Sequence, residues 1–330
     1  MLVKVHQTKC ESNISLEIRL ENAGAFPSPQ LCVKPPKINV EMSEDRSYKT
    51  THGQNDNNGL LQFFCRHLVS LCFTFQKLDD KNRTISEIIF DAFPGVIINI
   101  RGIFHFLTAG HILQDLDDAL RKEKVIIHSS VLADTFGPGA TSPQPIPFDF
   151  LNEPKFYIDN EEDGLDFGLI MLRPYYVRLL EKHGIIAIFE KNWIYQDRLE
   201  FHRYAMLGLP EEFISAIQSG SDQNLQTLGS VSPTLISLQK PAVQPENIKK
   251  TKYSRFVGQL NSDIPLKSIA GMSGGPIFGF NLNPPVRYWI VAIQSRWLKT
   301  RGITFGCPLP VLANLLTEWT DELLKAKPEY

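Results

Sequence analysis

The chain has 330 residues, the length of one large domain or of two domains of ordinary size. Its 43% hydrophobic and 21% charged residues are typical of a globular protein and exclude a disordered, collagen-like or coiled-coil chain. The formal net charge is −2 and no dense cluster of lysine and arginine occurs, so no nucleic-acid partner is expected.

Cysteine usage and hydropathy indicate the compartment. Five cysteines, an odd number without a C-x-x-C pair, predict neither a disulfide framework nor a zinc site. The first 19 residues mix charged with apolar side chains and contain no signal-peptide core. No apolar run approaches the roughly 18 residues that a membrane span needs. We therefore expect a soluble cytoplasmic protein without a membrane partner.

Residues 1–61 differ from the rest of the chain. Leu16–Leu20 predicts a short strand, but proline-rich stretches follow it and residues 43–59 are almost entirely polar. We interpret 1–61 as an N-terminal extension that ends in a flexible polar linker. Residues 1–60 are a candidate partner-docking element, with a pro-segment and an adaptor surface as alternatives.

The remaining chain is divided into short apolar segments by turn signals. Strands are predicted at Leu68–Phe75, Gly95–Ile100, Ile103–Thr108, Lys124–His128, Phe167–Leu172, Tyr204–Gly208, Thr234–Leu238, Gly275–Phe280, Tyr288–Gln294 and Gly302–Phe305. Helices are predicted at Ile112–Lys122, Tyr175–His183 and Val311–Leu324. Many short strands at this spacing are typical of an all-β sandwich or barrel.

The strongest chemical signal is the hexapeptide Gly-Met-Ser-Gly-Gly-Pro at 271–276. A serine between glycines lies on a tight turn that leaves its hydroxyl exposed. The backbone N–H groups of such a turn can converge on a developing oxyanion. We predict Ser273 as a nucleophile and the N–H groups of Gly271 and Ser273 as an oxyanion hole. An ordinary glycine-rich hairpin turn is the alternative.

A general base must precede this serine. The hexapeptide also fits the G-x-S-x-G elbow of α/β-hydrolases, but that fold needs its histidine after the serine. The last histidine of the chain is His202, which excludes this arrangement. Among the eight histidines, His111 is the candidate base, because it follows the small residues Thr-Ala-Gly at the end of a predicted strand. A hydrogen-bonded structural histidine is the alternative.

Asp166 is the candidate carboxylate that orients the imidazole. It stands at the start of the apolar run 165–172, where a carboxylate without a partner would be costly. His111 would supply that partner, whereas Glu162 and Asp163 precede it in a polar turn. A turn residue that caps the strand is the alternative.

Together the three segments resemble the trypsin/chymotrypsin-like serine peptidase superfamily. Thr-Ala-Gly-His at 108–111 resembles T-A-A-H, Asp-Phe-Gly-Leu at 166–169 resembles D-I-A-L, and the serine hexapeptide resembles G-D-S-G-G-P. The order is His, Asp, Ser, with gaps of 55 and 107 residues. The stretch 302–310 is similar to one in HtrA-like bacterial peptidases, here expected without a PDZ domain. Met272 stands where secreted trypsins have an aspartate that pairs with a newly cleaved amino terminus. Activation through that ion pair is therefore not expected.

The resemblance implies an all-β fold of two antiparallel six-stranded β-barrels, with the triad in the cleft between them. The expected units are the N-terminal extension 1–61, a first barrel 62–185 carrying His111 and Asp166, a second barrel 186–310 carrying Ser273, and a C-terminal helix 311–330.

The function implied by the resemblance is that of a serine endopeptidase. It would hydrolyse a polypeptide substrate through an acyl-enzyme, with no metal and no organic cofactor. A catalytically silent module that binds peptides or a partner protein on the same fold, and an esterase with the same triad, are the alternatives.

Two further residues are assigned to substrate binding by the same resemblance. Ser295 would lie in the strand that lines the substrate cleft. Lys267, six residues before the nucleophile, would lie at the base of the specificity pocket and favour an acidic side chain. A solvated loop lysine is the alternative, and the HtrA-like resemblance instead implies a preference for small aliphatic side chains.

Overall fold

The computed structural model describes residues 4–7, 16–19, 56–81, 83–122, 124–134, 136, 145–193, 201–219, 226–241, 248–261, 266–281 and 287–316. Near the N-terminus, β1 (Lys4–Gln7) and β2 (Leu16–Arg19) form an antiparallel ladder, which confirms the strand expected at Leu16–Leu20. The rest of the predicted extension up to residue 55 lies outside the described residues.

Helix α1 (Asp56–Cys65) corrects the end of the interpreted extension, because residues 56–61 are helical and not a flexible linker. Its first turn, Asp-Asn-Asn-Gly, is polar, but the turns that follow contain two leucines and two phenylalanines. Phe64 is fully buried and stacks on Phe278 of the distant β16, with the ring centroids 4.3 Å apart. Most helical stability in proteins comes from packing of an apolar face. The helix therefore forms although its first residues favour a loop.

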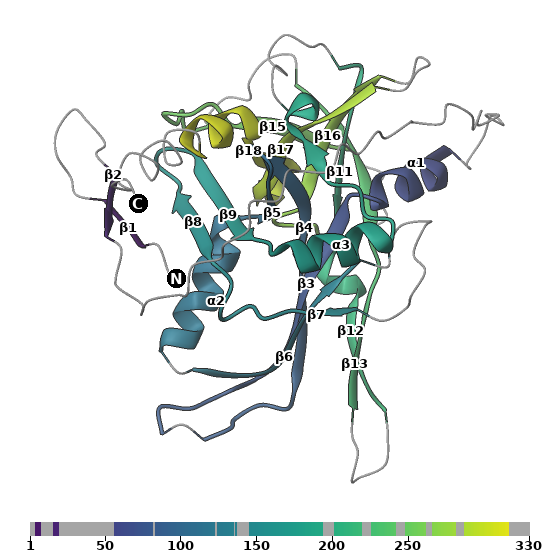
Figure 1. Ribbon diagram of the computed structural model, residues 1–330. Helices are drawn as coiled ribbons and strands as arrows, with labels where there is room; N and C mark the ends of the chain where they lie inside the picture. The colour runs from purple at the N-terminus through teal and green to yellow at the C-terminus, as the bar shows by residue number, and fades with distance from the viewer. Residues whose placement is uncertain are drawn as a thin grey trace, which may run out of the picture.

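The first half of the molecule is built on an eight-stranded sheet. Its strands follow the order β7-β6-β3-β4-β5-β9-β8, and β10 adds to β4 in parallel. The strands are β3 (Leu68–Lys77), β4 (Ile89–Ile100), β5 (Ile103–Thr108), β6 (Val125–Ala133), β7 (Ile146–Pro147), β8 (Lys155–Asn160), β9 (Leu165–Met171) and β10 (Ile188–Phe189). Two helices pack against this sheet, α2 (Gly110–Arg121) and α3 (Pro174–Lys182) (Figure 1).

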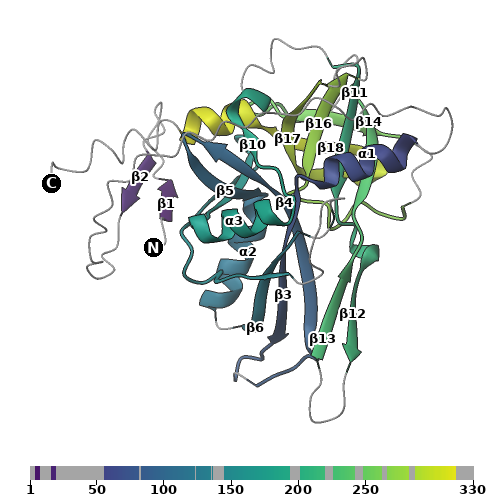
Figure 2. The same cartoon turned by 45° about the vertical axis from the view of Figure 1, so that its right-hand side comes forward.

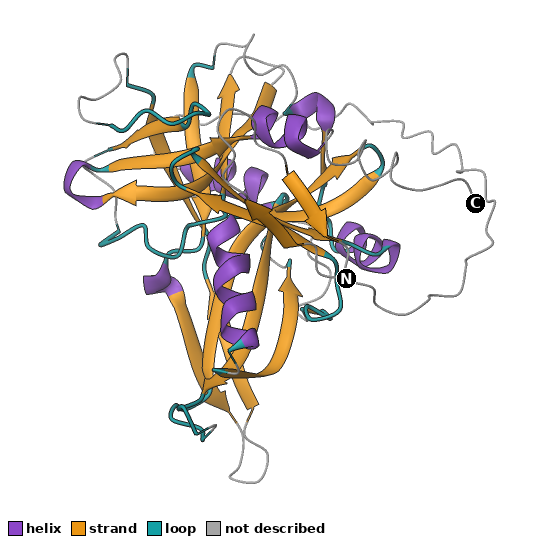
Figure 3. Ribbon diagram, turned by 90° about the vertical axis from the view of Figure 1, so that its left-hand side faces the viewer, coloured by secondary structure: helices purple, strands orange, loops and turns teal. Residues whose placement is uncertain are grey.

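The six-stranded barrel expected for the first half is not confirmed, because the strands described there form an eight-stranded sheet. Among the described residues no ladder joins the outer strands β7 and β8. Helix α2 lies between these ends of the sheet, in contact with β8, β9 and β6 (Figure 3). Its apolar stripe buries Ile112 and Leu113. The core of the first half is therefore covered by an amphipathic helix where a closed barrel would have a strand pair.

The second half is a closed six-stranded barrel, as expected. The strands follow the order β11-β14-β15-β18-β17-β16, and β16 returns to pair with β11. They are β11 (Arg203–Gly208), β14 (Thr234–Gln239), β15 (Phe256–Leu260), β16 (Pro276–Asn281), β17 (Arg287–Leu298) and β18 (Ile303–Pro308). Residues 309–316 then form a helix, which confirms the predicted C-terminal helix over 311–316. Its predicted continuation lies outside the described residues.

One buried apolar cluster joins the two halves. The largest buried apolar cluster combines residues of the first sheet, such as Val96 and Leu169, with Phe278 and Ile293 of the barrel. Strand β10 pairs with β4, so the chain stays with the first sheet beyond the boundary expected at residue 185. No helix in the described part of the chain is long and apolar enough to cross a membrane.

A hairpin of the second half reaches along the first. Its strands, β12 (Ile214–Ser219) and β13 (Gln226–Val231), run beside β4 in both views (Figures 1 and 2). A Cβ atom on Gly229 would lie 2.1 Å from the ring of Phe90, which shows how closely the hairpin packs on that strand. No local pattern in the sequence indicated this hairpin.

Candidate active site

The structure brings two of the predicted catalytic residues into direct contact. His111 lies in the first turn of α2, and its Nδ1 is 2.8 Å from Oδ2 of Asp166 in β9. The backbone N–H of His111 also donates to Oδ1 of Asp166, at 2.9 Å. Asp166 is only 3% exposed. Because a carboxylate accepts at Nδ1, this nitrogen carries the proton and the lone pair of Nε2 is available to accept another.

The surroundings of His111 make it a stronger base. Burial is the largest single influence and lowers its pKa. The hydrogen bond and charge of Asp166, with the charges of Asp159 and Asp115, act in the opposite direction. Together they raise the pKa of His111 above its ordinary value of 6.5. The imidazole is therefore suited to take a proton near neutral pH.

Ser273 lies in the turn before β16, held between two glycines in left-handed conformations. The φ angles of Gly271 and Gly274 are +86° and +88°, which side chains rarely adopt. A Cβ atom on Gly274 would lie 2.0 Å from Oγ1 of Thr108 and 2.5 Å from the carbonyl oxygen of Pro94. The serine turn is therefore packed directly on the end of β5, beside the start of α2. The tight turn predicted from the hexapeptide is present.

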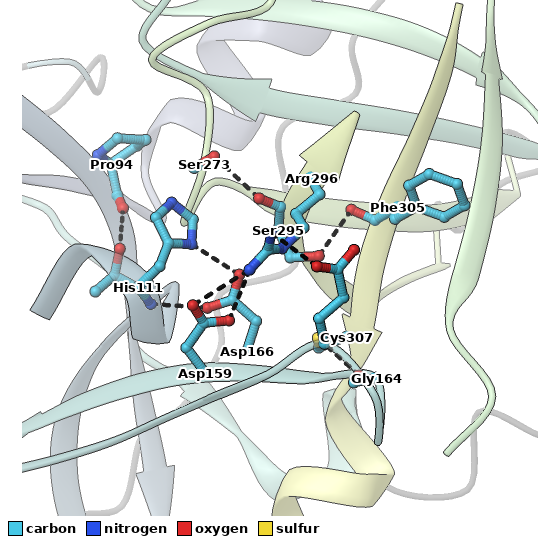
Figure 4. A network of polar contacts seen from close by, with 12 residues as sticks. Pro94, His111, Asp159, Gly164, Asp166, Ser273, Ser295, Arg296, Phe305 and Cys307 are labelled. Carbon is cyan, nitrogen blue, oxygen red and sulfur yellow. Dashed lines mark hydrogen bonds and ion pairs between the residues drawn. The ribbon is translucent and has the colours of Figure 1, made fainter. Parts of the chain in front are cut away.

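The Ser273 hydroxyl and the His111 imidazole share one cavity of about 420 Å³. In the view of Figure 4 the imidazole lies between the Asp166 carboxylate and Ser273. The hydroxyl donates to the carbonyl oxygen of Ser295 at 3.2 Å, and no hydrogen bond among the described residues joins it to His111. In unliganded enzymes the bond between nucleophile and base is often long and tightens only when substrate binds.

The backbone of the serine turn leaves two N–H groups for a ligand. The N–H groups of Met272, Gly274 and Gly275 donate to protein carbonyl oxygens. No acceptor among the described residues binds the N–H of Gly271 or of Ser273. These are the two donors that the sequence assigned to an oxyanion hole.

Ser295 takes part in the site through its backbone. The ladder between β17 and β18 shifts register between Gln294 and Arg296, which places Ser295 at a bulge. Its side chain is buried and its hydroxyl donates to the carbonyl oxygen of Phe305 at 3.4 Å. The Ser295 side chain thus bonds to β18, and its carbonyl group accepts the hydrogen bond of the Ser273 hydroxyl.

Lys267 is exposed in this structure and does not line the cavity that contains Ser273. Its backbone N–H donates to Oε1 of Glu212 at 2.9 Å. This placement corresponds to the solvated loop lysine that was the alternative.

Sequence reasoning missed an ion pair beside the His111–Asp166 pair. Nη2 of Arg296 in β17 is 3.0 Å from Oδ1 of Asp159, and Nη1 is 3.3 Å from Oε2 of Glu161 (Figure 4). Asp159 stands opposite Asp166 in the ladder between β8 and β9. The partners are 137 residues apart, so no local pattern could have indicated their pairing.

The described residues contain no group of three histidine, cysteine, aspartate or glutamate side chains arranged to hold a metal ion. The site as described consists of a hydroxyl, an imidazole, a buried carboxylate and two backbone donors.

Comparisons with known proteins give structural likeness at low identity. No protein-family model matches the chain, and no curated protein matches it. The protease Anisep from Arthrobacter nicotinovorans is similar with a TM-score of 0.40 and 14% identity, over 74% of this chain and 90% of that one. The thermostable serine protease AL20 from an extremophilic microorganism gives 0.36 and 13%, over 74% and 91%. A catalytically inactive tobacco etch virus protease complexed with substrate gives 0.31 and 11%, over 76% and 83%.

These neighbours are proteases, but at such TM-scores and identities the likeness assigns no family.

Proposed function

We propose that the chain is a serine endopeptidase with Ser273 as nucleophile, His111 as general base and acid, and Asp166 as the orienting carboxylate. The observation that carries this proposal is the double hydrogen bond between His111 and the buried Asp166, because His111 also lines the cavity that contains Ser273. A carboxylate held this way fixes the imidazole tautomer and stabilises the imidazolium that forms during the reaction.

The proposed reaction begins when the Ser273 Oγ attacks the peptide carbonyl carbon and its proton passes to Nε2 of His111. The N–H groups of Gly271 and Ser273 bind the oxyanion, where one such donor is typically worth about 10²–10³ in rate. Nε2–H then protonates the leaving amine as the C–N bond breaks, which leaves an ester on Ser273. Water attacks this ester with His111 again as base, and Ser273 regains its proton when the acid product leaves.

A fluorophosphonate probe tests the proposal, because it reacts with an activated serine independently of substrate choice. We expect labelling of the intact protein, loss of labelling in Ser273→Ala, and strongly reduced labelling in His111→Ala and Asp166→Asn. Ser129→Ala, which removes an exposed hydroxyl on β6, serves as the matched control. A folded protein that is never labelled, or a Ser273→Ala variant that is labelled as well as the wild type, would contradict the proposal.

One observation favours a second candidate, a silent peptide-binding module. The Ser273 hydroxyl donates to Ser295 and not to His111 in this structure. Under this alternative the protein binds peptides in the cavity but is not labelled by the probe. Peptide binding by fluorescence anisotropy, measured beside the labelling, distinguishes the two functions.

A further inference from the structure

A groove runs from Ser273 and His111 into the first half of the molecule. It is the cavity of about 420 Å³ that contains both residues, a size within the range of roughly 300–1,000 Å³ seen for ligand sites. One wall is helix α2, through Ile112, Leu116 and Leu120. These residues are four apart and so lie along one stripe of the helix. The groove therefore follows the helix away from the reacting serine.

The opposite wall is one face of the sheet β6-β3-β4. Phe73 and Phe75 alternate along β3, and Phe73 pairs with Asp91 of β4, two residues before Phe93. Alternate residues of a strand share a face, so the three phenylalanines point to the same side. All three line the groove. Nine of its fifteen lining residues are apolar, which makes the groove suited to an apolar side chain.

The charges in the groove disfavour an acidic ligand. Asp91 and Asp115 line it, and Lys77 is the single lysine or arginine among its lining residues. Burial raises the pKa of Asp91, and the charge of Glu211 adds to this effect. A second carboxylate beside Asp91 would meet a like charge in a partly desolvated place. Lys77 is exposed, so its charge is largely screened by solvent.

The position of the groove relates it to one side of the scissile bond. In the proposed reaction the leaving amine takes its proton from His111. The groove is walled by the helix that carries His111 and by the first sheet, while Gly271 and Ser273 are the residues of the second half that line it within the described part of the chain. A segment that extends from the leaving amine along α2 enters the groove directly.

We propose that this groove binds a large apolar side chain, such as phenylalanine, leucine or methionine, on the leaving-group side of the bond cleaved at Ser273. The proposal rests on the endopeptidase function for its catalytic consequence. The binding of apolar peptides by the groove does not need catalysis and is tested separately.

The first experiment measures cleavage preference in a peptide library, with products identified by mass spectrometry. We expect large apolar residues to be enriched, and acidic residues depleted, among the first positions after the cut. Ala119→Phe places a ring into the groove and should reduce this enrichment at least about tenfold. Gln114→Phe puts the same ring on α2 outside the groove lining and should leave it unchanged.

A second groove variant guards against misfolding of the first. Phe75→Ala enlarges the groove and should broaden the preference towards bulkier groups, with thermal denaturation confirming that both variants are folded. The proposal would be overturned if the wild type showed no enrichment of large apolar residues, or showed it only before the cut. It would also be overturned if the enrichment after the cut survived Ala119→Phe.

The second experiment measures binding to Ser273→Ala by fluorescence anisotropy, with matched decapeptides that carry either phenylalanine or aspartate at one position. We expect the phenylalanine peptide to bind at least about tenfold more tightly, and Ala119→Phe to remove the difference. Equal binding of the two peptides overturns the groove proposal. Absence of fluorophosphonate labelling in the wild type overturns the endopeptidase function instead, so the two failures are distinguishable.

Discussion

Gly274 and Thr108 lie so close together that a Cβ atom on the glycine would stand 2.0 Å from Oγ1 of the threonine. Thr108 itself donates to the carbonyl oxygen of Pro94 at 2.8 Å, so it has no room to turn away without losing a buried hydrogen bond. This contact joins the turn that holds Ser273 to the strand that ends beside His111. Ser273 can therefore lie this close to His111 only because Gly274 has no side chain.

Gly274→Ala should move the turn that carries Ser273 away from the end of β5 and from His111. The added methyl group meets Thr108 and Pro94, and the φ of +88° is strained for alanine. We expect a loss of about 1–3 kcal/mol in the free energy of unfolding and at least a tenfold fall in the rate of fluorophosphonate labelling. Gly59→Ala is the matched control, since nothing lies within 4 Å of its added Cβ. Wild-type labelling of Gly274→Ala would contradict the expectation.

The pH dependence of labelling should report the pKa of His111. Only the neutral imidazole takes a proton, so the rate should rise with pH, with its midpoint above 6.5 because the neighbouring carboxylates stabilise the imidazolium. Asp159→Asn removes one of these negative charges and also takes away the ion-pair partner of Arg296. The pKa of His111 should therefore fall, and the midpoint of the labelling rate should move to lower pH. Glu161→Gln also touches Arg296 and should leave the midpoint in place. Equal shifts in both variants would show that Arg296 alone sets the profile.

Lys267→Ala should leave substrate selectivity unchanged. The side chain is exposed and outside the cavity that contains Ser273. The same peptide library, cleaved by the variant and by the wild type, provides the measurement. A preference for acidic side chains that disappears in Lys267→Ala would restore the pocket position implied by the family resemblance.

Phe64→Ala should destabilise the whole molecule and not only α1. Its ring is fully buried against Phe278 of the second barrel, and such a truncation typically costs about 3–5 kcal/mol. Urea denaturation followed by tryptophan fluorescence measures the loss. Phe213→Ala, which truncates a ring that is 40% exposed, should cost far less. Equal losses in the two variants would mean that packing of α1 adds little.

Much of the fold was accessible from local sequence pattern. The strand expected at Ile103–Thr108 has the observed bounds, and the expected helix Ile112–Lys122 corresponds to α2 at Gly110–Arg121. These segments have clear periodicity and clear turn signals at both ends. Helix α1 and the hairpin β12–β13 were missed, because their structure depends on packing against strands far away in the sequence. The same applies to the open edge of the first sheet, which α2 covers.

Those parts of the candidate site that depend on neighbouring residues in the sequence could be predicted from it. The serine turn could be recognised from its glycines, and His111 and Asp166 from small or apolar neighbours. The structure places these two side chains in direct contact, and their catalytic roles are a proposal. The ion pair between Arg296 and Asp159 and the groove along α2 could not be predicted, because each is created by the meeting of segments from different parts of the chain.

The closure of the barrel in the second half has a consequence for the order of folding. Strand β18 completes that barrel by pairing with both β15 and β17, and β17 supplies the carbonyl group that holds the Ser273 hydroxyl. The strand that holds this hydroxyl is therefore fully paired only when residues 303–308 are in place. Because contacts distant in sequence form slowly, we expect the turn that carries Ser273 to reach its final position late in folding, after the local hairpins have formed.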